Sequence, residues 1–532
     1  MKAYLIAIIA GALSVAAYAP LEWWWLMPLC LGILFQLLQN TKQFNGFRLA
    51  FLFSLGQFGV GASWVYVSLQ TYGNMPVWMA AIAVFFFVAA CASLTGLMGF
   101  IYARYNGSLQ QYGLNSILFF TVLWVLAEWS RSILFTGFPW LDIGYSQTTQ
   151  WLSGYAPIGS VYLVSFVTVF VAALLCIVVR YVIATNAGAF LHSSVNISAN
   201  VNRNTALSYG VIAVFLIAGG AFLRTIQWSQ ALEKSYQVVI VQANVSVDQK
   251  WLRQNQSPII NDYIDQISQY NADLVILPET ALPVSLHQTD DRLWRLLRGQ
   301  NKALLSGVVE RDLIKGEIYN SANLVCDGFV KQDESNKSQE QQSSFYQGEQ
   351  IYRKQHLVPF GEYLPLRNLL NWVLAYLQIP MSDFSAGEQG NSLNCDQLEV
   401  SVSICYEDAF ASEMRHALLN NKQSGMLVNI SEDAWFGNSL APHQRVQMAQ
   451  MRAIELARPM LRSANSGPST FIDFQGKLRA TTAQFQQDSM QVEVTPRQGD
   501  TPFLRFGLWI IVVCLIFFVG LIARQKIFLS NQ

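Results

Sequence analysis

The sequence predicts two kinds of fold in one chain: a multi-pass α-helical membrane domain and an α/β domain whose sheet faces are covered. The first indication is charge, because residues 1–227 carry only three acidic and eight basic residues, whereas the other 305 residues carry 31 and 26. The second is a series of long apolar runs in the first part, and the third is a series of short β-branched runs in the second. The net charge of zero averages two different environments, so it indicates nothing about a nucleic-acid partner.

Eight apolar runs are long enough to cross a hydrocarbon core of about 30 Å as helices. They lie near residues 3–19, 22–40, 48–70, 77–103, 114–130, 158–185, 209–226 and 506–523. The lysine and the short apolar stretch at the start are also found in signal peptides. A second apolar run follows within a few residues, however, which favours a retained first helix.

Basic residues predict the orientation of these helices, because short cytoplasmic loops are enriched in lysine and arginine. A cytoplasmic N-terminus places on the cytoplasmic side Lys2, Lys42, Arg48, Arg104, Arg180, Arg203, Arg524 and Lys526. Of the short loops that face outward, only the one after the fifth helix has a basic residue, Arg131. We therefore expect a membrane domain over 1–227, an extracytoplasmic domain over 228–505, and a last helix with a cytoplasmic tail over 506–532.

Residues 228–505 show the pattern of an α/β domain, in which β-branched runs alternate with helical or polar stretches. Amphipathic stretches at 257–271 and 443–459 predict helices. The polar insertion QDESNKSQEQQSS at 332–344 predicts a mobile loop without chemistry. The runs that predict strands are 236–245, 272–280, 303–310, 321–326, 399–407, 425–433, 469–476 and 489–496.

Three reactive side chains stand where such folds place catalytic groups, at strand ends and in fixed loops. Glu279 ends LVILPE, Cys405 ends VSVSIC, and Lys354 lies in YRKQHLVPFGEYLP at 352–365. Each has a plain alternative: a helix-capping acid, a core cysteine and a solvated lysine. Together they supply what a thiol nucleophile needs, because Glu279 can accept the thiol proton and Lys354 can stabilise an oxyanion.

The segment SVSICYEDAF at 401–410 places two acids directly after the cysteine. Acidic neighbours raise the pKa of a thiol unless a cation offsets them. We expect Lys354 to be the cation that offsets Glu407 and Asp408.

The other cysteines and the histidines indicate less. An oxidising compartment would permit a disulfide between Cys326 and Cys395, which the sequence alone leaves open. The chain contains no CxxC pair, and its five histidines show no metal-ligand spacing.

The motifs LPET, RKQHLVPFGEYLP and SICYED resemble the catalytic motifs of the nitrilase, or carbon–nitrogen hydrolase, superfamily. In that superfamily a Glu–Lys–Cys triad sits on an αββα sandwich. With membrane helices on both sides, the chain resembles the apolipoprotein N-acyltransferases, which add the third acyl chain to bacterial lipoproteins. Further matches follow in the same order: SWVYVS (63–68), TGFPWLDIGYSQ (136–147), NISEDAWFG (429–437) and ELARPMLRSANSG (455–467).

The resemblance implies roles for nine side chains: a triad, three supporting residues and three aromatic residues that line a lipid entrance. The triad comprises the general base Glu279, the oxyanion stabiliser Lys354 and the nucleophile Cys405. The supporting and aromatic residues are Glu362, Tyr406, Glu407, Trp251, Trp435 and Phe436. Plain apolar packing of Trp435 is an equal alternative. The family's NDAWFG reads EDAWFG here, so Glu432 replaces an asparagine and its role is open.

The resemblance also implies a ping-pong acyltransferase that requires no metal or organic cofactor. The thiolate would take an acyl chain from a membrane phospholipid as a thioester. The acceptor would be the α-amino group of the diacylglyceryl-cysteine of an apolipoprotein. We expect a monomer in a bacterial inner membrane, with a periplasmic catalytic domain, lipid partners and no nucleic-acid partner.

Two other functions are alternatives on the sequence alone. One is a membrane-tethered amidase or nitrilase that acts on a small amide, although eight spans exceed what a tether needs. The other is a transporter or scaffold with a catalytically inactive outer domain, whose helices should carry pore-facing charges. Only Glu128 qualifies as such a charge, and its spacing from Arg131 near a helix end predicts a surface ion pair.

Overall fold

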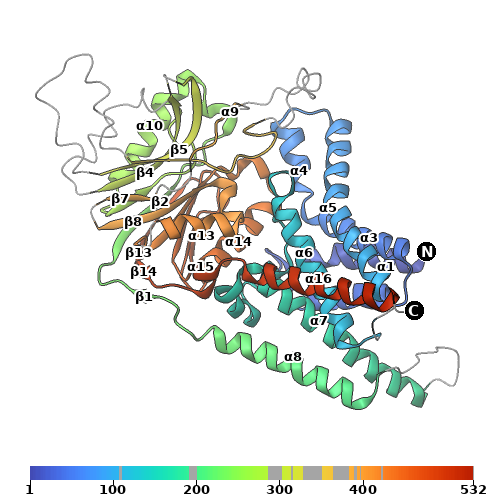
Figure 1. Ribbon diagram of the computed structural model, residues 1–532. Helices are drawn as coiled ribbons and strands as arrows, with labels where there is room; N and C mark the ends of the chain where they lie inside the picture. The colour runs from blue at the N-terminus through green and yellow to red at the C-terminus, as the bar shows by residue number, and fades with distance from the viewer. Residues whose placement is uncertain are drawn as a thin grey trace, which may run out of the picture. The chain divides into compact units, whose positions relative to one another are not determined.

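The computed structural model describes most of the chain, which divides into two compact units (Figure 1). The first unit comprises Met1–Tyr66, Pro76–Gln227 and Arg505–Gln532, and the second comprises Val67–Met75 and Trp228–Leu504. The described residues are 1–106, 109, 111–190, 201–284, 302–312, 315–326, 350–363, 383–388, 392–395, 397–420 and 423–530, without the side chains of 186–190 and 525–530. The polar insertion at 332–344 lies outside them.

The first unit is built from apolar helices. They are α1 (Lys2–Ser14), α2 (Leu26–Leu38), α3 (Gln43–Gly61), α4 (Trp64–Val67), α5 (Val77–Asn106), α6 (Leu114–Ile133), α7 (Ala156–Phe190), α8 (Arg203–Leu223) and α16 (Trp509–Ser530). Within the described residues, α5 to α8 with their adjoining turns are four helices long and apolar enough to cross a membrane. The helix α3 with the following segment Trp64–Tyr72 is a fifth candidate, and α1, α2 and Trp509–Arg524 are shorter apolar helices.

The composition of the apolar run 48–70 predicted one continuous helix, but the structure shows a bent one. It breaks after Gly61, and the two helical pieces are inclined by 50°. Gly59 and Gly61 precede the break. Since glycine is a poor helix former, the helix is weakest at this point.

Glu128 and Arg131 do not form the predicted surface ion pair; both are buried. Arg131 pairs instead with Asp142, at 2.5 Å. Glu128 accepts hydrogen bonds from the Trp124 indole at 2.9 Å and from the backbone amide of Ile143 at 2.8 Å. The prediction was wrong because the segment after α6 folds back and brings buried partners to both charges.

Among the described residues of the second unit are two six-stranded sheets, in the orders β13-β2-β3-β4-β5-β6 and β12-β11-β10-β9-β8-β7. The strands β2, β3 and β4 are parallel, as are β8, β9 and β10, and the outer strands are antiparallel. The bounds are β2 (Tyr236–Gln242), β3 (Leu274–Ile276), β4 (Ala303–Asp312), β5 (Glu317–Val325), β6 (Gln350–Arg353), β7 (Leu393–Cys395), β8 (Leu398–Ile404), β9 (Met426–Ser431), β10 (Met460–Ala464), β11 (Thr470–Ile472), β12 (Leu478–Thr481) and β13 (Asp488–Val494).

The two sheets pack face to face, and helices cover their outer faces (Figure 1). The Ser463 hydroxyl in β10 donates to the carbonyl of Val241 in β2 at 3.0 Å and so joins the sheets. The helix α10 (Arg253–Ser268) packs on the first sheet, and α13 (Ala411–Asn420) and α14 (Ala441–Leu456) lie on the second. Because both faces of each sheet are covered, central strands such as β2 are apolar on both sides.

The predicted α/β fold is confirmed, and each predicted strand run overlaps a strand. Six of the described strands were not predicted: β6, β7, β10 and β12 in the two large sheets, and the paired short strands β1 (Gln230–Ala231) and β14 (Arg497–Gln498). The omission of β10 matters most, because this strand lies inside its sheet. Its sequence MLRSA places Arg462 and Ser463 in a fully buried strand. A charged residue at such a position hides the apolar pattern that indicates a strand.

A disulfide joins Cys326, directly after β5, to Cys395, the last residue of β7. The two strands belong to different sheets, so the bond links the sheets at one edge. The bonded residues are 69 positions apart, and the enclosed chain includes Lys354 and Glu362.

We predict that replacing Cys326 and Cys395 by alanine lowers the free energy of unfolding of the second unit by up to about 4 kcal/mol, from the loop entropy that the bond removes. The measurement is denaturant unfolding in detergent, with and without a reductant. The reductant should lower the midpoint of the wild-type protein and leave that of the double variant unchanged. A wild-type midpoint that does not respond to reduction of this bond would contradict the prediction.

Candidate active site

Glu279, Lys354 and Cys405 converge in the second unit, each beyond the end of a strand. Glu279 is the third residue after β3, Lys354 directly follows β6, and Cys405 directly follows β8. All three are buried, with exposures of 5%, 1% and 9%. The Nζ atom of Lys354 lies 3.5 Å from Oε1 of Glu279, and the charges of both act on the thiol.

Lys354 lies between two carboxylates. Its Nζ donates to Oε1 of Glu362 at 2.8 Å, in addition to the contact with Glu279. The Nδ2 atom of Asn320, in β5, donates to both carboxylates, at 2.7 and 2.9 Å. Burial by itself would lower the pKa of Lys354, but the two carboxylates outweigh it and raise the pKa above its ordinary value. The side chain is therefore a cation at neutral pH.

The carboxylate of Glu279 is held through both oxygens. Oε1 accepts from Asn320, and Oε2 accepts from the backbone amide of Glu432 at 2.8 Å. The backbone at Glu279 also requires Gly307 in β4, because a Cβ there would lie 2.7 Å from the Cα of Glu279 and 2.4 Å from the amide nitrogen of Thr280. Asn320 in β5, the amide of Glu432 and the close packing against β4 together set the orientation of this carboxylate.

Cys405 has an unusual backbone conformation, with φ of 51°. Non-glycine residues adopt such angles only where their surroundings hold them. The carbonyl of Cys405 accepts from Nδ2 of Asn429 at 3.1 Å and from Nη2 of Arg445 at 2.6 Å. Burial and the carboxylate of Glu279 raise the pKa of the Cys405 thiol to about 11, against the cations Lys354 and Arg445. At neutral pH the group is a thiol, so its use as a nucleophile requires a proton acceptor.

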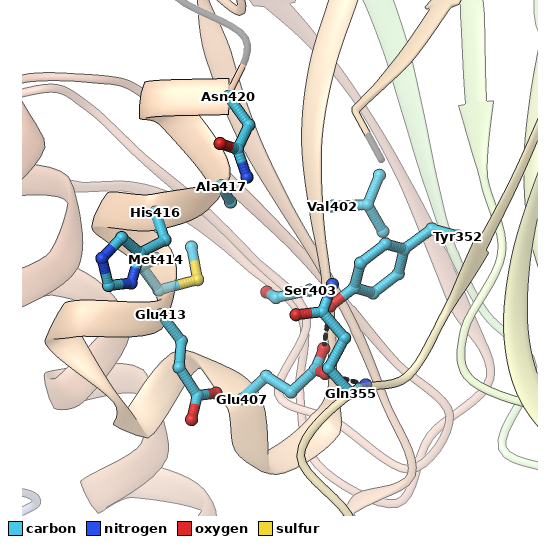
Figure 2. A pocket seen from close by; sticks show the side chains of 10 residues that line it. All are labelled: Tyr352, Gln355, Val402, Ser403, Glu407, Glu413, Met414, His416, Ala417 and Asn420. Carbon is cyan, nitrogen blue, oxygen red and sulfur yellow. Dashed lines mark hydrogen bonds between the residues drawn. The ribbon is translucent and has the colours of Figure 1, made fainter. Parts of the chain in front are cut away.

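Glu407 ties the lysine-bearing segment to the turn of Cys405. Its carboxylate accepts from the backbone amides of Gln355 at 2.7 Å, His356 at 3.2 Å and Ile404 at 2.6 Å. The hydroxyl of Tyr352 also donates to it, at 2.9 Å (Figure 2). Burial raises the pKa of Glu407 to about 7.

A small cavity opens beside Glu407 (Figure 2). Its volume of about 40 Å³ accommodates only a few water molecules, so it is not a site for an acyl chain. It is lined by Tyr352, Gln355, Val402, Ser403, Glu407, Glu413, Met414, His416, Ala417 and Asn420.

Asp408 pairs with a different cation from the one that the sequence predicted. Its carboxylate accepts from Nη2 of Arg445, in α14, at 2.7 Å. Lys354 pairs with Glu362 and Glu279 instead. The expectation that Lys354 offsets both acids after the cysteine is wrong for Asp408, because α14 packs on this turn and brings its own arginine.

The three aromatic residues predicted at a lipid entrance differ in exposure. Trp251 is 37% exposed and directly follows α9 (Val247–Lys250), Trp435 is half-buried, and Phe436 is buried. The ring of Trp435 packs edge-on against Tyr72, with centroids 5.4 Å apart. Its carbonyl accepts from the Ser68 hydroxyl at 2.8 Å. Trp435 is therefore packed against neighbouring residues, whereas Trp251 exposes more of its side chain.

Tyr406, the remaining supporting residue, is buried beside Cys405. Its ring meets those of Phe410 and His356 edge-on, with centroids 5.0 and 5.9 Å apart. These contacts hold the short turn that begins at Cys405.

Glu432, in the position where the resemblance implies an asparagine, forms a buried ion pair with Lys250 at 2.6 Å. The same oxygen of Glu432 accepts from Nδ2 of Asn465 at 2.8 Å. Lys250 directly precedes Trp251, and the amide of Glu432 donates to Glu279. Glu432 therefore links the segment of Trp251 to the strand ends that carry the site.

The site also contains buried polar residues that the sequence analysis did not identify. Asn429 lies inside the apolar run MLVNIS of β9, and this is the signal that could have indicated it. Asn320 lies in β5, whose sequence EIYNSANLV is more polar and gives no such signal. Arg445 gives no such signal, because an arginine in an amphipathic helix is ordinarily taken to be solvated.

The stacked sheets and the buried glutamate, lysine and cysteine define a carbon–nitrogen hydrolase domain, and the family model of that name matches residues 237–501. The model of the apolipoprotein N-acyltransferase N-terminal domain matches residues 10–174. The chain belongs to the apolipoprotein N-acyltransferase family, because it is 34% identical to the apolipoprotein N-acyltransferase of Methylococcus capsulatus over 96% of this chain and 93% of that protein.

A second relative is the apolipoprotein N-acyltransferase of Chromobacterium violaceum. It is 33% identical, and the match covers 94% of this chain and 90% of the relative. Among solved structures, a carbon–nitrogen hydrolase superfamily protein of Xanthomonas campestris is 15% identical, with a TM-score of 0.35, and the match covers 49% of this chain and 91% of that one.

We predict that Glu432→Gln lowers the free energy of unfolding by about 3 kcal/mol, because it leaves the Lys250 ammonium buried without its counter-charge. Lys250→Met in the same chain should restore much of that loss. The measurement is a double-mutant cycle with both single variants and the pair. Strictly additive effects would show that the two side chains do not interact.

Proposed function

We propose that the protein transfers an acyl chain from a membrane phospholipid to the α-amino group of the N-terminal diacylglyceryl-cysteine of apolipoproteins. The observation that carries the proposal is the buried cluster of Glu279, Lys354 and Cys405 in a carbon–nitrogen hydrolase domain. Two findings support the choice of substrates: the four apolar helices of membrane-spanning length in the described part of the chain, and relatives named apolipoprotein N-acyltransferase that align over nearly the whole chain.

In the first half-reaction the Cys405 sulfur attacks the ester carbonyl of the phospholipid while Glu279 takes the thiol proton. The pKa of about 11 explains why the base is needed. The Lys354 cation stabilises the oxyanion of the tetrahedral intermediate. The C–O bond to the lipid then breaks, and the alkoxide receives the proton from Glu279. The lysophospholipid is released, and the acyl chain remains on Cys405 as a thioester.

In the second half-reaction the α-amine of the acceptor attacks the thioester. Glu279 takes a proton from the amine, Lys354 again stabilises the oxyanion, and the C–S bond breaks. The proton returns to the Cys405 sulfur, and the product is an amide. Both half-reactions use only acid–base and nucleophilic groups of the protein, so the proposed mechanism includes no metal or organic cofactor.

The supporting residues act in this scheme by holding the triad. Glu362 orients the Lys354 ammonium, Glu407 fixes the backbone after Lys354, and Tyr406 stabilises the turn of the nucleophile. We assign the lipid entrance to Trp251, Trp435 and Phe436, and the partial exposure of Trp251 supports its place there.

We further propose that the protein is a monomer that crosses the inner membrane of a bacterium eight times. The parts would be a membrane domain over 1–227, a periplasmic catalytic domain over 228–505, and a last helix with a cytoplasmic tail over 506–532. The distribution of basic residues supports cytoplasmic termini. The disulfide of Cys326 and Cys395 supports a periplasmic catalytic domain, because such bonds persist in oxidising compartments.

We predict that the enzyme, given phospholipid alone, releases about one lysophospholipid per protein and stalls as an acyl thioester. A diacylated lipopeptide should restart turnover. The measurements are intact-protein mass and released lysophospholipid, and Cys405→Ser is the control that should form no thioester and transfer nothing. Steady release of fatty acid without the acceptor would instead identify a hydrolase, and turnover of small amides alone would identify an amidase.

Reporter fusions test the proposed topology. A reporter that is active only outside the cytoplasm should work when it is fused after Gln227, because seven spans from a cytoplasmic N-terminus end at the outer face. The same reporter should be inactive when it is fused after the last residue. The reverse pattern would place residues 228–505 in the cytoplasm and remove the proposed substrates from reach.

A further inference from the structure

We propose that Arg445 is a positioning residue for the nucleophile: it holds the backbone of Cys405 in its left-handed conformation and places a second cation beside the sulfur. The inference rests on the proposed function only in taking Cys405 as the nucleophile. It adds to the triad a residue from α14, a helix that carries none of the predicted catalytic groups.

One guanidinium group contacts the nucleophile at two points. Nη2 of Arg445 donates to the carbonyl oxygen of Cys405 at 2.6 Å, and Nη1 lies 3.8 Å from Sγ. Nη2 also donates to Asp408 at 2.7 Å, which fixes the direction of the fork. Arg445 and Asp408 are each 0% exposed, so water does not screen these contacts.

The contact with the carbonyl has a structural consequence. Cys405 has φ of 51° directly after β8, where the chain turns sharply. This conformation is unfavourable for a residue with a Cβ. The carbonyl hydrogen bonds from Arg445 and Asn429 hold the residue in it.

The contact with the sulfur has an electrostatic consequence. On one side the thiol faces Lys354 with Glu279 and Glu362, one cation with two carboxylates, and this excess of negative charge opposes a thiolate. The acids of its own turn are Glu407, which is hydrogen-bonded to backbone amides, and Asp408. The Arg445 guanidinium is the second cation that acts on the thiol.

The negative charge of Asp408 is shared between two arginines, so it does not fully cancel the positive charge of Arg445. The second oxygen of Asp408 is 3.9 Å from Nε of Arg462, which in turn pairs with Asp433 at 2.7 Å. All four side chains are 0% exposed. The chain of alternating charges keeps the guanidinium buried at a fixed place, from which it favours the thiolate over the thiol.

The test is the pH dependence of Cys405 alkylation by iodoacetamide in the purified full-length protein, followed by peptide-resolved mass spectrometry. In Arg445→Met we expect the midpoint of alkylation to rise by about one pH unit, a tenfold loss of thiolate, because a cation close to the sulfur is removed. Arg445→Lys keeps the charge without the fork, so it should recover part of the midpoint but not the rate of thioester formation.

The matched control is Arg452→Met. Arg452 lies two turns further along α14, is also 0% exposed, and pairs with Glu455 at 3.1 Å. Its replacement should lower stability while leaving the alkylation midpoint of Cys405 unchanged. If Arg445→Met does not fold, Arg445→Lys still decides the question, because its alkylation midpoint should still lie above that of the wild type.

Two outcomes would overturn the inference: a midpoint and a thioester rate in the Arg445 variants that equal those of the wild type, or a shift of the same size in Arg452→Met. Alkylation requires no substrate, so this result is independent of the proposed reaction. Failure of the proposed function would appear separately, as a wild-type protein that alkylates normally but forms no thioester with phospholipid.

Discussion

A buried lysine between two carboxylates is the interaction on which the rest of the site depends. Lys354 is 1% exposed, and an unpaired ammonium at that depth would lose its proton. Glu362 and Glu279 keep it charged, and Asn320 joins the two carboxylates. The same arrangement leaves a net negative charge next to the thiol. Cys405 is consequently protonated at rest, and Glu279, whose carboxylate opposes its ionisation, is also the base that we propose for its proton.

The two stacked sheets provide the rigidity that this balance of charges requires. Glu279 stands beyond a strand of one sheet and Cys405 beyond a strand of the other, so their separation depends on how the sheets pack. Three kinds of contact hold that packing: the hydrogen bond from Ser463 to Val241, the disulfide at the edge, and the amide of Glu432 on Glu279. The first uses the short serine side chain, the second is covalent, and the third uses the backbone amide of Glu432.

Much of the fold and of the candidate site could be predicted because its signals are local. Cys405 and Glu279 occur where predicted strands end, Lys354 lies in a predicted fixed loop, and the structure places all three beyond strands. The predictions were wrong where a charged residue takes its partner from a distant segment of the chain. Arg131 was assigned to Glu128 three residues away, but it pairs with Asp142 after a turn of the chain. The strand β10 was missed because Arg462, at its centre, is neutralised by Asp433 from another segment.

The sequence by itself determined the division into an apolar helical part and an α/β part, the positions of most strands, and the three side chains that converge in the candidate site. These follow from composition and periodicity, which short-range sterics and burial impose on neighbouring residues. Only the tertiary structure decided which charges meet. It assigned Arg445 to Asp408 and Cys405, Lys250 to Glu432, and Cys326 to Cys395. The physical reason is that a buried charge or thiol takes whichever partner the packing of sheets and helices brings within a few ångströms, and separation along the chain does not encode that distance.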